Sequence, residues 1–535
     1  MKKLGKFLIY GFLITNFSFA IGRIDVVGYT YSDWQWNGPP FTNCVCDSYI
    51  GIYVSWGSGT APNYTDRNIG YNVYEFTVGD WAWPNGINTF VQPSGFGGMD
   101  VDLVTGNVVL STNQTISSNL TPVLAQEFLV GTGVFSYSVG PTGYRSPPIA
   151  ITNNQAIHCV MFSSATYDSL YYTRVQPWAI WSTPINISSP NPADYPDHNI
   201  NGSKLSNKIV VTWDAINDSS KYYRQSLDGG QSWRASVLLI PPAFSPGSET
   251  VPASWLGSFG FYDRNDNLHI VTQVSTYYSV WPAEIWHYCP TNNPVWTKVH
   301  RAEAVNISAP IGYNGVAACR PSLAQNPITG TLYCVWEQFD SLNYEPSTYL
   351  LRADIWMSES HDNGLTWVNN RRITTPNTTS KRFPIAAGTV WRDTLWVRYI
   401  IDSIAGFAVV EQGRATRNPV VAHWVPVPSG FAIEEQSTHN PPKADIMLNA
   451  SPNPFSTHTA IRFSLSANNN TLLEIFDVTG RLVKTFNAVS GQRTAVSEFV
   501  WNGQDNQGKT VKNGVYFCAL KMDNKTITRK IIKTK

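Results

Sequence analysis

Three arginines stand at matching places along the chain, each just ahead of a proline that opens an apolar segment. They are Arg145, Arg320 and Arg382, and the comparable place in an intervening segment holds Asp197. A guanidinium group offers donors in a rigid fork that suits a planar anion such as a carboxylate. We therefore interpret Arg145, Arg320, Arg382 and Asp197 as candidate ligand-binding residues of an anion- or glycan-facing patch.

The same pattern has a purely structural explanation, in which each arginine caps a strand end or pairs with a neighbouring carboxylate. The acids Asp100, Asp102 and Glu337 likewise fit structural turns or strands as well as they fit acid–base chemistry. No tyrosine can be paired with a glutamate by spacing, because 26 tyrosines are spread through the chain. The sequence thus designates no catalytic residue.

Other chemical signatures are absent from the sequence. It contains no Gly-rich phosphate loop, no His-Glu-x-x-His and no Gly-x-Ser-x-Gly. The nine histidines are dispersed without a ligand spacing, so we expect no metal and no cofactor. A formal net charge of +1 gives no electrostatic reason to expect nucleic acid as a partner.

The seven cysteines do not suggest a disulfide framework. Cys44 and Cys46 are too close for an unstrained bridge to each other. Cys159 and Cys334 occupy matching places in apolar strand segments, and another such segment carries valine there. A cysteine that exchanges with valine behaves as a small buried hydrophobe, so we expect mostly free, buried thiols.

The elements that position these residues are β-strands. Aromatic residues make up 13% of the 535 residues and charged residues 14%, while 38 Gly and 34 Pro are scattered along the chain. This composition is typical of an all-β protein with many turns. From residue 21 to about 425 a unit repeats: a short strand, a turn, an apolar strand and a hairpin closing on Trp.

Two of the closing turns follow the pattern Ser-x-Asp-x-Gly-x-Ser/Thr-Trp. An aspartate at such a turn accepts hydrogen bonds from the amides that follow it, and glycine tolerates the positive φ of the corner. The closing Trp then packs on neighbouring strands. The structural residues are Ser226, Asp228, Gly230 and Trp233 in one turn, and Ser360, Asp362, Gly364 and Trp367 in the other.

This pattern is the Asp-box, and the body therefore resembles the sialidase-like (BNR-repeat) β-propeller superfamily. The resemblance implies a ring of four-stranded blades in which the motif holds outer-rim hairpins. Successive closing Trp residues, at 181, 233, 296 and 367, give six or seven blades over residues 21–424. The segment through Cys46–Tyr53 is then the first blade or the closing strand. The Arg-Ile-Pro signature of the family is absent, and Arg23-Ile24-Asp25 is a poor substitute.

A different module follows a Pro-rich linker at 425–446. Residues 447–535 contain period-2 strands joined by Gly turns, which predict a small immunoglobulin-like β-sandwich. The ordered set Pro-Asn-Pro-Phe, Asp-x-x-Gly-Arg, Trp-x-Gly-x-Asp and Gly-Val-Tyr-Phe closely resembles the type A C-terminal sorting domain of the type IX secretion system. That resemblance implies the secretion machinery as a partner. The alternative is a plain adhesion-type sandwich with no sorting role.

The N-terminus predicts export. Lys2, Lys3 and Lys6 precede an apolar run that ends at Ala20, which is typical of a signal peptide over residues 1–20. No later segment is apolar enough to cross a membrane. We expect a protein secreted or held on the outer surface of a Gram-negative-type bacterium, by way of the periplasm.

The sequence favours a binding propeller, with an extracellular glycan or protein as the ligand. Aromatic-rich propeller faces can bind sugars by stacking, although Trp is also common in blade cores. A sialidase-type exo-glycosidase is the second hypothesis, and a structural cell-surface protein is the third.

Overall fold

The computed structural model describes residues 22–427 and 448–534 with short internal gaps. The predicted signal peptide and all but the first three residues of the predicted linker lie outside the described residues. The gaps fall at 177, 216–219, 240–251, 254–255, 277–278, 306–308, 452, 464–471, 478, 488–496 and 523–524.

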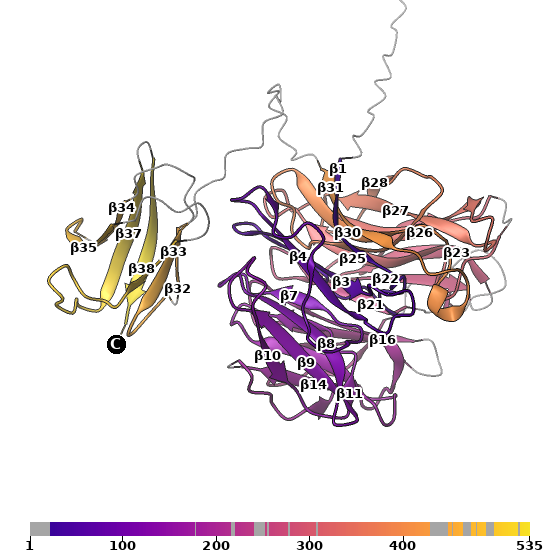
Figure 1. Ribbon diagram of the computed structural model, residues 1–535, viewed down its shortest axis with the longest axis horizontal. Helices are drawn as coiled ribbons and strands as arrows, with labels where there is room; N and C mark the ends of the chain where they lie inside the picture. The colour runs from indigo at the N-terminus through magenta and orange to yellow at the C-terminus, as the bar shows by residue number, and fades with distance from the viewer. Residues whose placement is uncertain are drawn as a thin grey trace, which may run out of the picture.

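The described part of 22–427 forms seven antiparallel sheets of four or five strands, which are the blades of a propeller (Figure 1). Blades one to three comprise β2 (Cys44–Asp47), β3 (Gly51–Ser58), β4 (Asn68–Glu75), β5 (Asp80–Trp81) and β6 (Ile87–Asn88); β7 (Met99–Val101), β8 (Val108–Ile116), β9 (Asn119–Glu127) and β10 (Phe135–Val139); and β11 (Tyr144–Arg145), β12 (Ile149–Ile151), β13 (Ile157–Ser163), β14 (Leu170–Val175) and β15 (Ile185–Asn186).

Blades four to seven have the same pattern, and the last one takes up the first strand of the chain. They comprise β16 (Ala193–Gly202), β17 (Ile209–Ala215), β18 (Lys221–Ser226) and β19 (Val237–Leu239); β20 (Pro252–Ala253), β21 (Ser258–Tyr262), β22 (Leu268–Thr276), β23 (Ser279–Tyr288) and β24 (Trp296–Ala302); β25 (Ala318–Gln325), β26 (Leu332–Tyr344), β27 (Leu351–Ser360) and β28 (Val368–Arg372); and β29 (Ser380–Ala386), β30 (Thr394–Asp402), β31 (Asn418–Pro426) and β1 (Arg23–Thr30).

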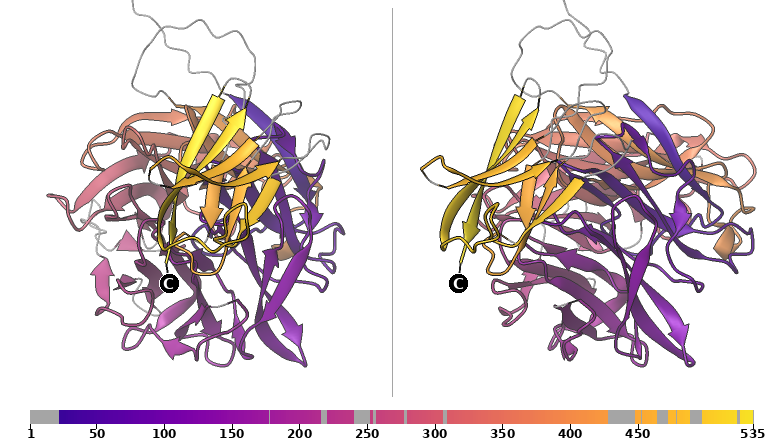
Figure 2. Two further views of the ribbon diagram at one scale, coloured as in Figure 1. Left: turned by 90° about the vertical axis from the view of Figure 1, so that its left-hand side faces the viewer. Right: turned by 60° about the vertical axis from the view of Figure 1, so that its left-hand side comes forward.

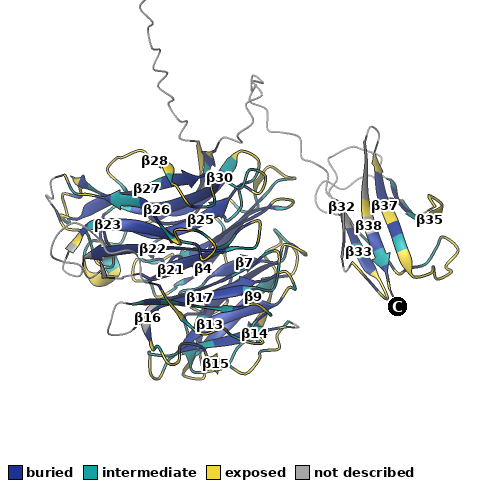
Figure 3. Ribbon diagram, turned by 180° about the vertical axis from the view of Figure 1, so that it is seen from behind, coloured by how far each residue is buried: buried dark blue, intermediate teal, exposed yellow. Residues whose placement is uncertain are grey.

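The blades form a closed ring. The inner strands β2, β7, β12, β16, β21, β25 and β29 contact one another in this order, and β29 contacts β2. The colour run in Figures 1 and 2 follows the same circuit from indigo to orange. Closure leaves no unpaired blade face, and the strands are mostly buried while many connecting turns are exposed (Figure 3).

The ring is closed by pairing the two ends of the body. Strand β1 pairs antiparallel with β31, from Arg23 opposite Trp424 to Thr30 opposite Asn418. The segment through Cys46–Tyr53, predicted as the first blade or the closing strand, is the first blade, and Arg23–Thr30 closes the ring.

The segment between β1 and β2, Tyr31–Asn43, fills the centre of the ring, and we call it the plug. Its Asn37 carbonyl accepts a hydrogen bond of 2.7 Å from Asn314, just ahead of blade six. Its Pro40 carbonyl accepts one of 2.9 Å from Asn199 in blade four. The plug thus reaches opposite sides of the ring and links blades distant in sequence.

The two Ser-x-Asp turns form the hydrogen bonds that their sequence predicts. In the first turn, Asp228 Oδ1 accepts from the Ser232 amide at 2.9 Å, and the Ser226 hydroxyl accepts from the Gly230 amide at 2.8 Å. In the second turn, Asp362 Oδ1 accepts from the Thr366 amide at 2.8 Å. In these tight turns the carboxylates therefore accept the hydrogen bonds of backbone amides in place of backbone carbonyl groups.

Each of these turns also packs on the preceding blade. The Trp233 ring meets Tyr172 of blade three edge-on at 4.8 Å, and the Trp367 ring meets His287 of blade five at 5.4 Å. Gly364 has φ +84°, and a Cβ there would lie 2.1 Å from the His287 ring. Glycine is needed here for its backbone conformation and for the close approach of the two blades.

All seven cysteines are buried and unpaired. Burial raises the pKa of the Cys44 thiol to about 12, which keeps it in the unreactive thiol form.

Residues 448–534 form two sheets packed face to face as a small β-sandwich. One sheet contains β32 (Leu448–Ser451), β33 (Thr459–Phe463) and β36 (Ser497–Trp501). The other contains β35 (Leu482–Asn487), β34 (Leu472–Asp477), β37 (Gly514–Met522) and β38 (Lys525–Lys533).

The sequence motifs of this module meet in its core. Trp501 is fully buried, with its ring 5.3 Å from Phe455 and 5.1 Å from Tyr516. The Asp477 carboxylate accepts from the Arg481 amide at 3.1 Å across a turn in which Gly480 has φ +83°. The motifs therefore specify the packing and the turns of the sandwich.

We expect Asp228→Ala to lower the free energy of unfolding by about 1–2 kcal/mol, because it leaves amides of the turn without their acceptor. Urea denaturation of the full chain measures the change. Asp80→Ala, an exposed aspartate at the start of β5, is the control and should change stability by less than about 0.5 kcal/mol. Equal effects of the two substitutions would contradict the role of the turn.

Candidate ligand-binding site

Arg320 and Arg382 are brought together on one carboxylate. Arg320 Nη1 lies 2.5 Å from Glu337 Oε1, and Arg382 Nε lies 3.2 Å from Glu337 Oε2. The exposed fractions are 0% for Arg320 and Glu337 and 2% for Arg382. Burial alone would raise the pKa of Glu337, but Arg382 and Arg320 hold it at about 2. Both guanidinium groups are thus engaged inside the protein.

Aromatic rings and the plug enclose this cluster. Arg320 lies 4.7 Å from the Phe383 ring, and Arg382 lies 5.0 Å from the Phe407 ring. A third buried arginine, Arg398, donates to Gln35 of the plug. Burial lowers the pKa of Arg398 to about 9. The centre of the ring therefore contains a buried charge network with aromatic walls.

Arg145 and Asp197 lie elsewhere in the ring. Arg145 is half-buried in blade three, where its guanidinium carbon lies 5.4 Å from the Tyr167 ring. Asp197 is half-buried in β16 and precedes His198, whose Nε2 lies 3.0 Å from the Ser146 carbonyl oxygen. Thus Arg145 and Asp197 stand on adjacent segments of blades three and four, while Arg320 and Arg382 belong to blades six and seven.

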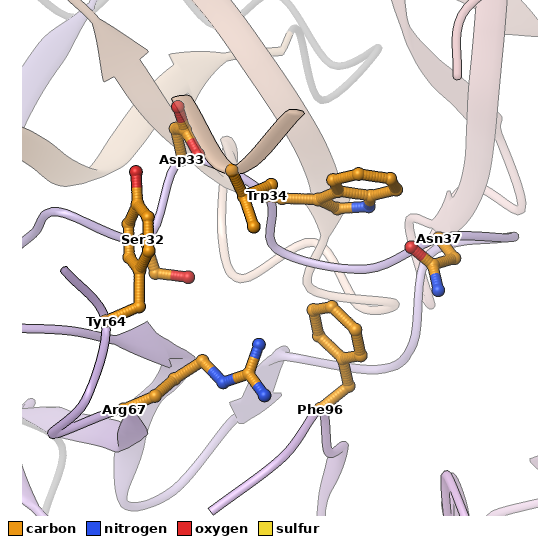
Figure 4. A pocket seen from close by; sticks show the side chains of 8 residues that line it. Ser32, Asp33, Trp34, Asn37, Tyr64, Arg67 and Phe96 are labelled. Carbon is orange, nitrogen blue, oxygen red and sulfur yellow. The ribbon is translucent and has the colours of Figure 1, made fainter. Parts of the chain in front are cut away.

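A cavity of about 210 Å³ opens beside the plug (Figure 4). The plug supplies one wall, the loop between β3 and β4 supplies a second, and the segment before β7 and the 3-10 helix η1 (Ala408–Val410) complete it. The lining residues are Ser32, Asp33, Trp34, Asn37, Tyr64, Arg67, Phe96 and Val409. We call this cavity the plug-side pocket.

Asp33 is a buried acid in the pocket lining, and only one of its two carboxylate oxygens has a hydrogen-bond partner among the described residues. Its side chain is 4% exposed. Oδ2 accepts a hydrogen bond of 2.6 Å from the Ala408 amide, whereas Oδ1 has no partner among the described residues. Burial raises the pKa of Asp33 to about 6, against the opposing effects of the Ala408 amide and Arg382.

Tyr64 has a second buried oxygen without a hydrogen-bond partner among the described residues. Its hydroxyl is buried and has no hydrogen-bond partner in the described part of the chain. The residue has φ +59°, a conformation that a tyrosine rarely adopts. Burial raises the pKa of the hydroxyl, and Asp33 and Asp402 add to the effect. Two residues of the pocket lining therefore each have a buried polar atom without a partner in the described part of the chain.

Aromatic side chains and a cation form the rest of the lining. The Trp34 ring stacks on Phe407 at 5.1 Å and meets the exposed Tyr313 edge-on at 5.4 Å. Arg67 lies with its guanidinium carbon 5.3 Å from the Phe96 ring. Figure 4 shows Tyr64, Arg67 and Phe96 facing the plug residues Asp33 and Trp34.

Asp402 lies outside the pocket lining and interacts electrostatically with Asp33. Its Oδ1 accepts from the Ile404 amide at 3.2 Å and from Asn418 Nδ2 at 3.1 Å. Burial, reinforced by the negative charge of Asp33, raises the pKa of Asp402 to about 8. At neutral pH this carboxyl is therefore mostly protonated.

The sequence analysis missed every residue that lines this pocket. Asp33 and Trp34 occur in a loop between two blades, and Tyr64 and Arg67 occur in a hairpin connection. None belongs to the repeat that directed attention to the arginines. One available signal was the polar and aromatic run Ser-Asp-Trp-Gln-Trp at residues 32–36, shortly after the first strand.

Within the described ranges, no group of three or more His, Cys, Asp or Glu is arranged to hold a metal ion. Nor does that part of the chain contain a helix with the length and hydropathy that a membrane crossing requires.

Comparison with known proteins identifies the C-terminal module. Residues 449–534 match the family model of the secretion system C-terminal sorting domain. The chain is a cargo of type IX secretion. It is delivered through this pathway to the cell surface or the extracellular space. A search of curated proteins found no match.

Solved structures resemble the body at low identity. A polysaccharide lyase of family PL25, an ulvan lyase, is 13% identical with a TM-score of 0.46, covering 75% of this chain and 96% of its own. The polysaccharide lyase Uly1 is 10% identical with a TM-score of 0.40, covering 75% and 92%. The NanB sialidase of Streptococcus pneumoniae is 11% identical with a TM-score of 0.37, covering 76% and 70%.

We expect Arg320→Ala to lower the free energy of unfolding by about 3–5 kcal/mol, because the buried Glu337 carboxylate loses its shortest ion pair. Arg145→Ala should cost less than about 1 kcal/mol, since Arg145 is half-buried. Urea denaturation compares the two. A stable Arg320→Ala protein would show that the buried cluster does not hold the centre together.

The raised pKa of Asp402 predicts a pH dependence of stability. The folded state keeps a proton that the unfolded chain releases above its ordinary pKa of about 4. Stability from this group therefore falls as the pH rises from about 4 to 8 and is constant above that. Asp402→Asn retains the acceptor for both hydrogen bonds and carries no charge. In urea denaturation, the free energy of unfolding of this variant relative to that of the wild type should rise by at least about 1 kcal/mol between pH 5 and pH 8. A constant difference would contradict the assignment.

Proposed function

We propose that this protein is a secreted or cell-surface propeller that binds carbohydrate in the plug-side pocket. The observation that carries the proposal is that two residues lining an aromatic-walled cavity, Asp33 and Tyr64, each have a buried side-chain oxygen without a hydrogen-bond partner among the described residues. Buried polar atoms are normally hydrogen-bonded. A sugar hydroxyl that donates to Asp33 and bonds to Tyr64 would satisfy both.

The walls of the pocket suit a sugar ring. Sugars present an apolar C–H face that stacks on aromatic side chains, and Trp34 and Phe96 offer such surfaces on two sides. Asn37 and Arg67 add polar contacts. At about 210 Å³ the cavity is smaller than drug-sized pockets of about 300–1,000 Å³, which favours a single sugar residue in it.

The body supports this role as a rigid scaffold. We propose that the Ser226 and Ser360 turns are Asp-boxes that fasten neighbouring blades and take no part in binding. We also propose that the half-buried Arg145 and Asp197 add a second contact with a long ligand, apart from the pocket.

A second candidate is a sialidase-type exo-glycosidase. It is favoured by one feature: an acid whose pKa is raised to about 6, Asp33, lines the same cavity as a tyrosine hydroxyl. Arg320 and Arg382 count against it, because Glu337 already occupies both guanidinium groups.

The binding proposal predicts that Trp34→Ala weakens glycan binding at least ten-fold, through loss of the stacking surface. Tyr64→Phe removes a hydroxyl that has no partner among the described residues, so it should weaken binding about five-fold with folding stability preserved. A glycan array followed by calorimetry on the full secreted chain measures both. Tyr49→Ala, an exposed tyrosine outside the pocket, should bind like wild type.

Two results would overturn this assignment. Absence of glycan binding, together with binding of a protein or self-association, would favour a protein ligand or a structural surface role. Turnover of a fluorogenic sialoside that is lost in Tyr64→Phe or Asp33→Asn would favour the glycosidase.

A further inference from the structure

Blade two ends in an edge strand that lacks the usual protection against pairing with another chain. Strand β10 is the last strand of its sheet, so one side of its backbone pairs with β9 and the other faces outward (Figure 1). It spans Phe135–Val139 with the sequence Phe-Ser-Tyr-Ser-Val, and no charged residue occurs from Phe128 to Tyr144. A strand edge without charge or proline is a template for a further strand.

The other outer edges of the propeller are protected. Strands β5, β6 and β15 have two residues each and β19 has three, which leaves little backbone for a further strand to pair with. The longer outer edges carry charge: a lysine and an arginine in β24, two arginines in β28, and Arg23 and Asp25 in β1. Among the described outer edges, β10 is therefore the one strand of five or more residues without a charged side chain.

The hydrogen-bond alternation shows which backbone groups of β10 face outward. The amide of Gly140, directly after the strand, donates to the Pro122 carbonyl at 2.9 Å. Residues that bond the neighbouring strand recur at every second position of an antiparallel ladder, so the two serines of β10 bond β9. The N–H and C=O groups of Phe135, Tyr137 and Val139 therefore point to the free edge.

Apolar side chains accompany this free edge. Tyr137 is 43% exposed and Val139 is 55% exposed, and Phe128, at the hairpin before β10, is 72% exposed. The Tyr137 hydroxyl donates to the Thr89 carbonyl at 2.8 Å, which holds the ring in place. Outward backbone groups beside exposed apolar surface are the features that strand addition uses.

The strand is complementary to a second copy of itself. In either direction its sequence gives an apolar residue, a serine, the tyrosine, a serine and an apolar residue. An antiparallel pair about a two-fold axis at Tyr137 places this residue opposite its own copy and Phe135 opposite Val139. The outward N–H and C=O groups of these residues then bond one another, and the aromatic–aromatic and aromatic–valine pairs are favourable across strands.

We infer that the chain forms a two-fold dimer in which β10 pairs antiparallel with β10 of a second copy, so that the two second blades become one continuous sheet. The symmetry of the strand sequence selects a second copy as the occupant. The uncharged edge brings no like charges together. Because pairing consumes this edge in both copies, the assembly stops at two.

Cysteine substitution tests the register of the dimer. Opposite residues of a hydrogen-bonded pair have Cα atoms about 5.5 Å apart, which a disulfide can span. Tyr137→Cys in the full secreted chain should therefore give a disulfide-linked dimer on mild oxidation, and the seven native cysteines do not interfere because they are buried. Non-reducing gels measure the product.

Val139→Cys is the matched control. Its side chain is more exposed than that of Tyr137, but the two-fold axis separates its two copies by about 13 Å, at about 3.3 Å per residue from 135 to 139. It should form no linked dimer. Absence of a linked dimer in Tyr137→Cys, equal linkage of the two variants, or linked species larger than a dimer would each overturn the inference.

A second variant separates pairing from folding. Val139→Pro removes an N–H group that faces the free edge and leaves the ladder with β9 intact. Sedimentation over a dilution series should show a concentration-dependent dimer for the wild type, weakened about five-fold or more in Val139→Pro. Val139→Thr keeps the N–H group and the strand propensity, so it should dimerise like the wild type. A monomeric wild type, or equal dimerisation of the proline and threonine variants, would contradict the pairing of β10.

Discussion

Strand β1 pairs with β31 along Arg23–Thr30, and this ladder holds the start and the end of the propeller in one sheet. The pairing closes the ring, so every blade is packed between two neighbours. It also directs the chain that follows β1 into the centre, where Tyr31–Asn43 becomes the plug. The pocket depends on this arrangement, because Asp33 and Trp34 enter it from the plug.

The plug packs against the buried charges of the centre. Its Gln35 accepts a hydrogen bond from Arg398, and its Trp36 packs edge-on on Phe383, the ring that lies against Arg320. Arg320 and Arg382 in turn neutralise Glu337. Water is excluded there, so charges must be paired internally or be neutralised by a change in protonation. Glu337 is ionised because two arginines face it, whereas Asp402 is largely protonated because burial outweighs its hydrogen bonds.

The pocket lies where this network meets solvent. Asp33 belongs to both, since its Oδ2 accepts a hydrogen bond from a backbone amide, its Oδ1 has no partner among the described residues, and the residue lines the cavity. A buried carboxylate oxygen without a hydrogen-bond partner among the described residues is costly for stability, and such features are common where a ligand completes the hydrogen bonding. The stable Ser-x-Asp turns lie elsewhere, so the rigid and the ligand-facing parts of the molecule are separate.

The sequence by itself determined the local structure. The Ser226 and Ser360 turns, the apolar strands and the motifs of the sorting domain depend on residues within a few positions of one another, and their hydrogen bonds follow from that spacing. The sequence predicted six or seven blades and did not decide between them, because the closing strand and blade one share no motif with the clear repeats.

Only the tertiary structure decided which residues line the pocket and which groups the arginines contact. The sequence left open whether Arg320 and Arg382 face a ligand or pair with a carboxylate, and they pair with Glu337, which the sequence offered only as an acid of undefined role. Arg320 meets Glu337 on the adjacent strand of its own blade, whereas Arg382 reaches Glu337 from the next blade and Arg398 meets Gln35 of the plug. Local patterns carry no information on such distant packing, and the residues of the plug-side pocket come from four separate segments that only ring closure brings together.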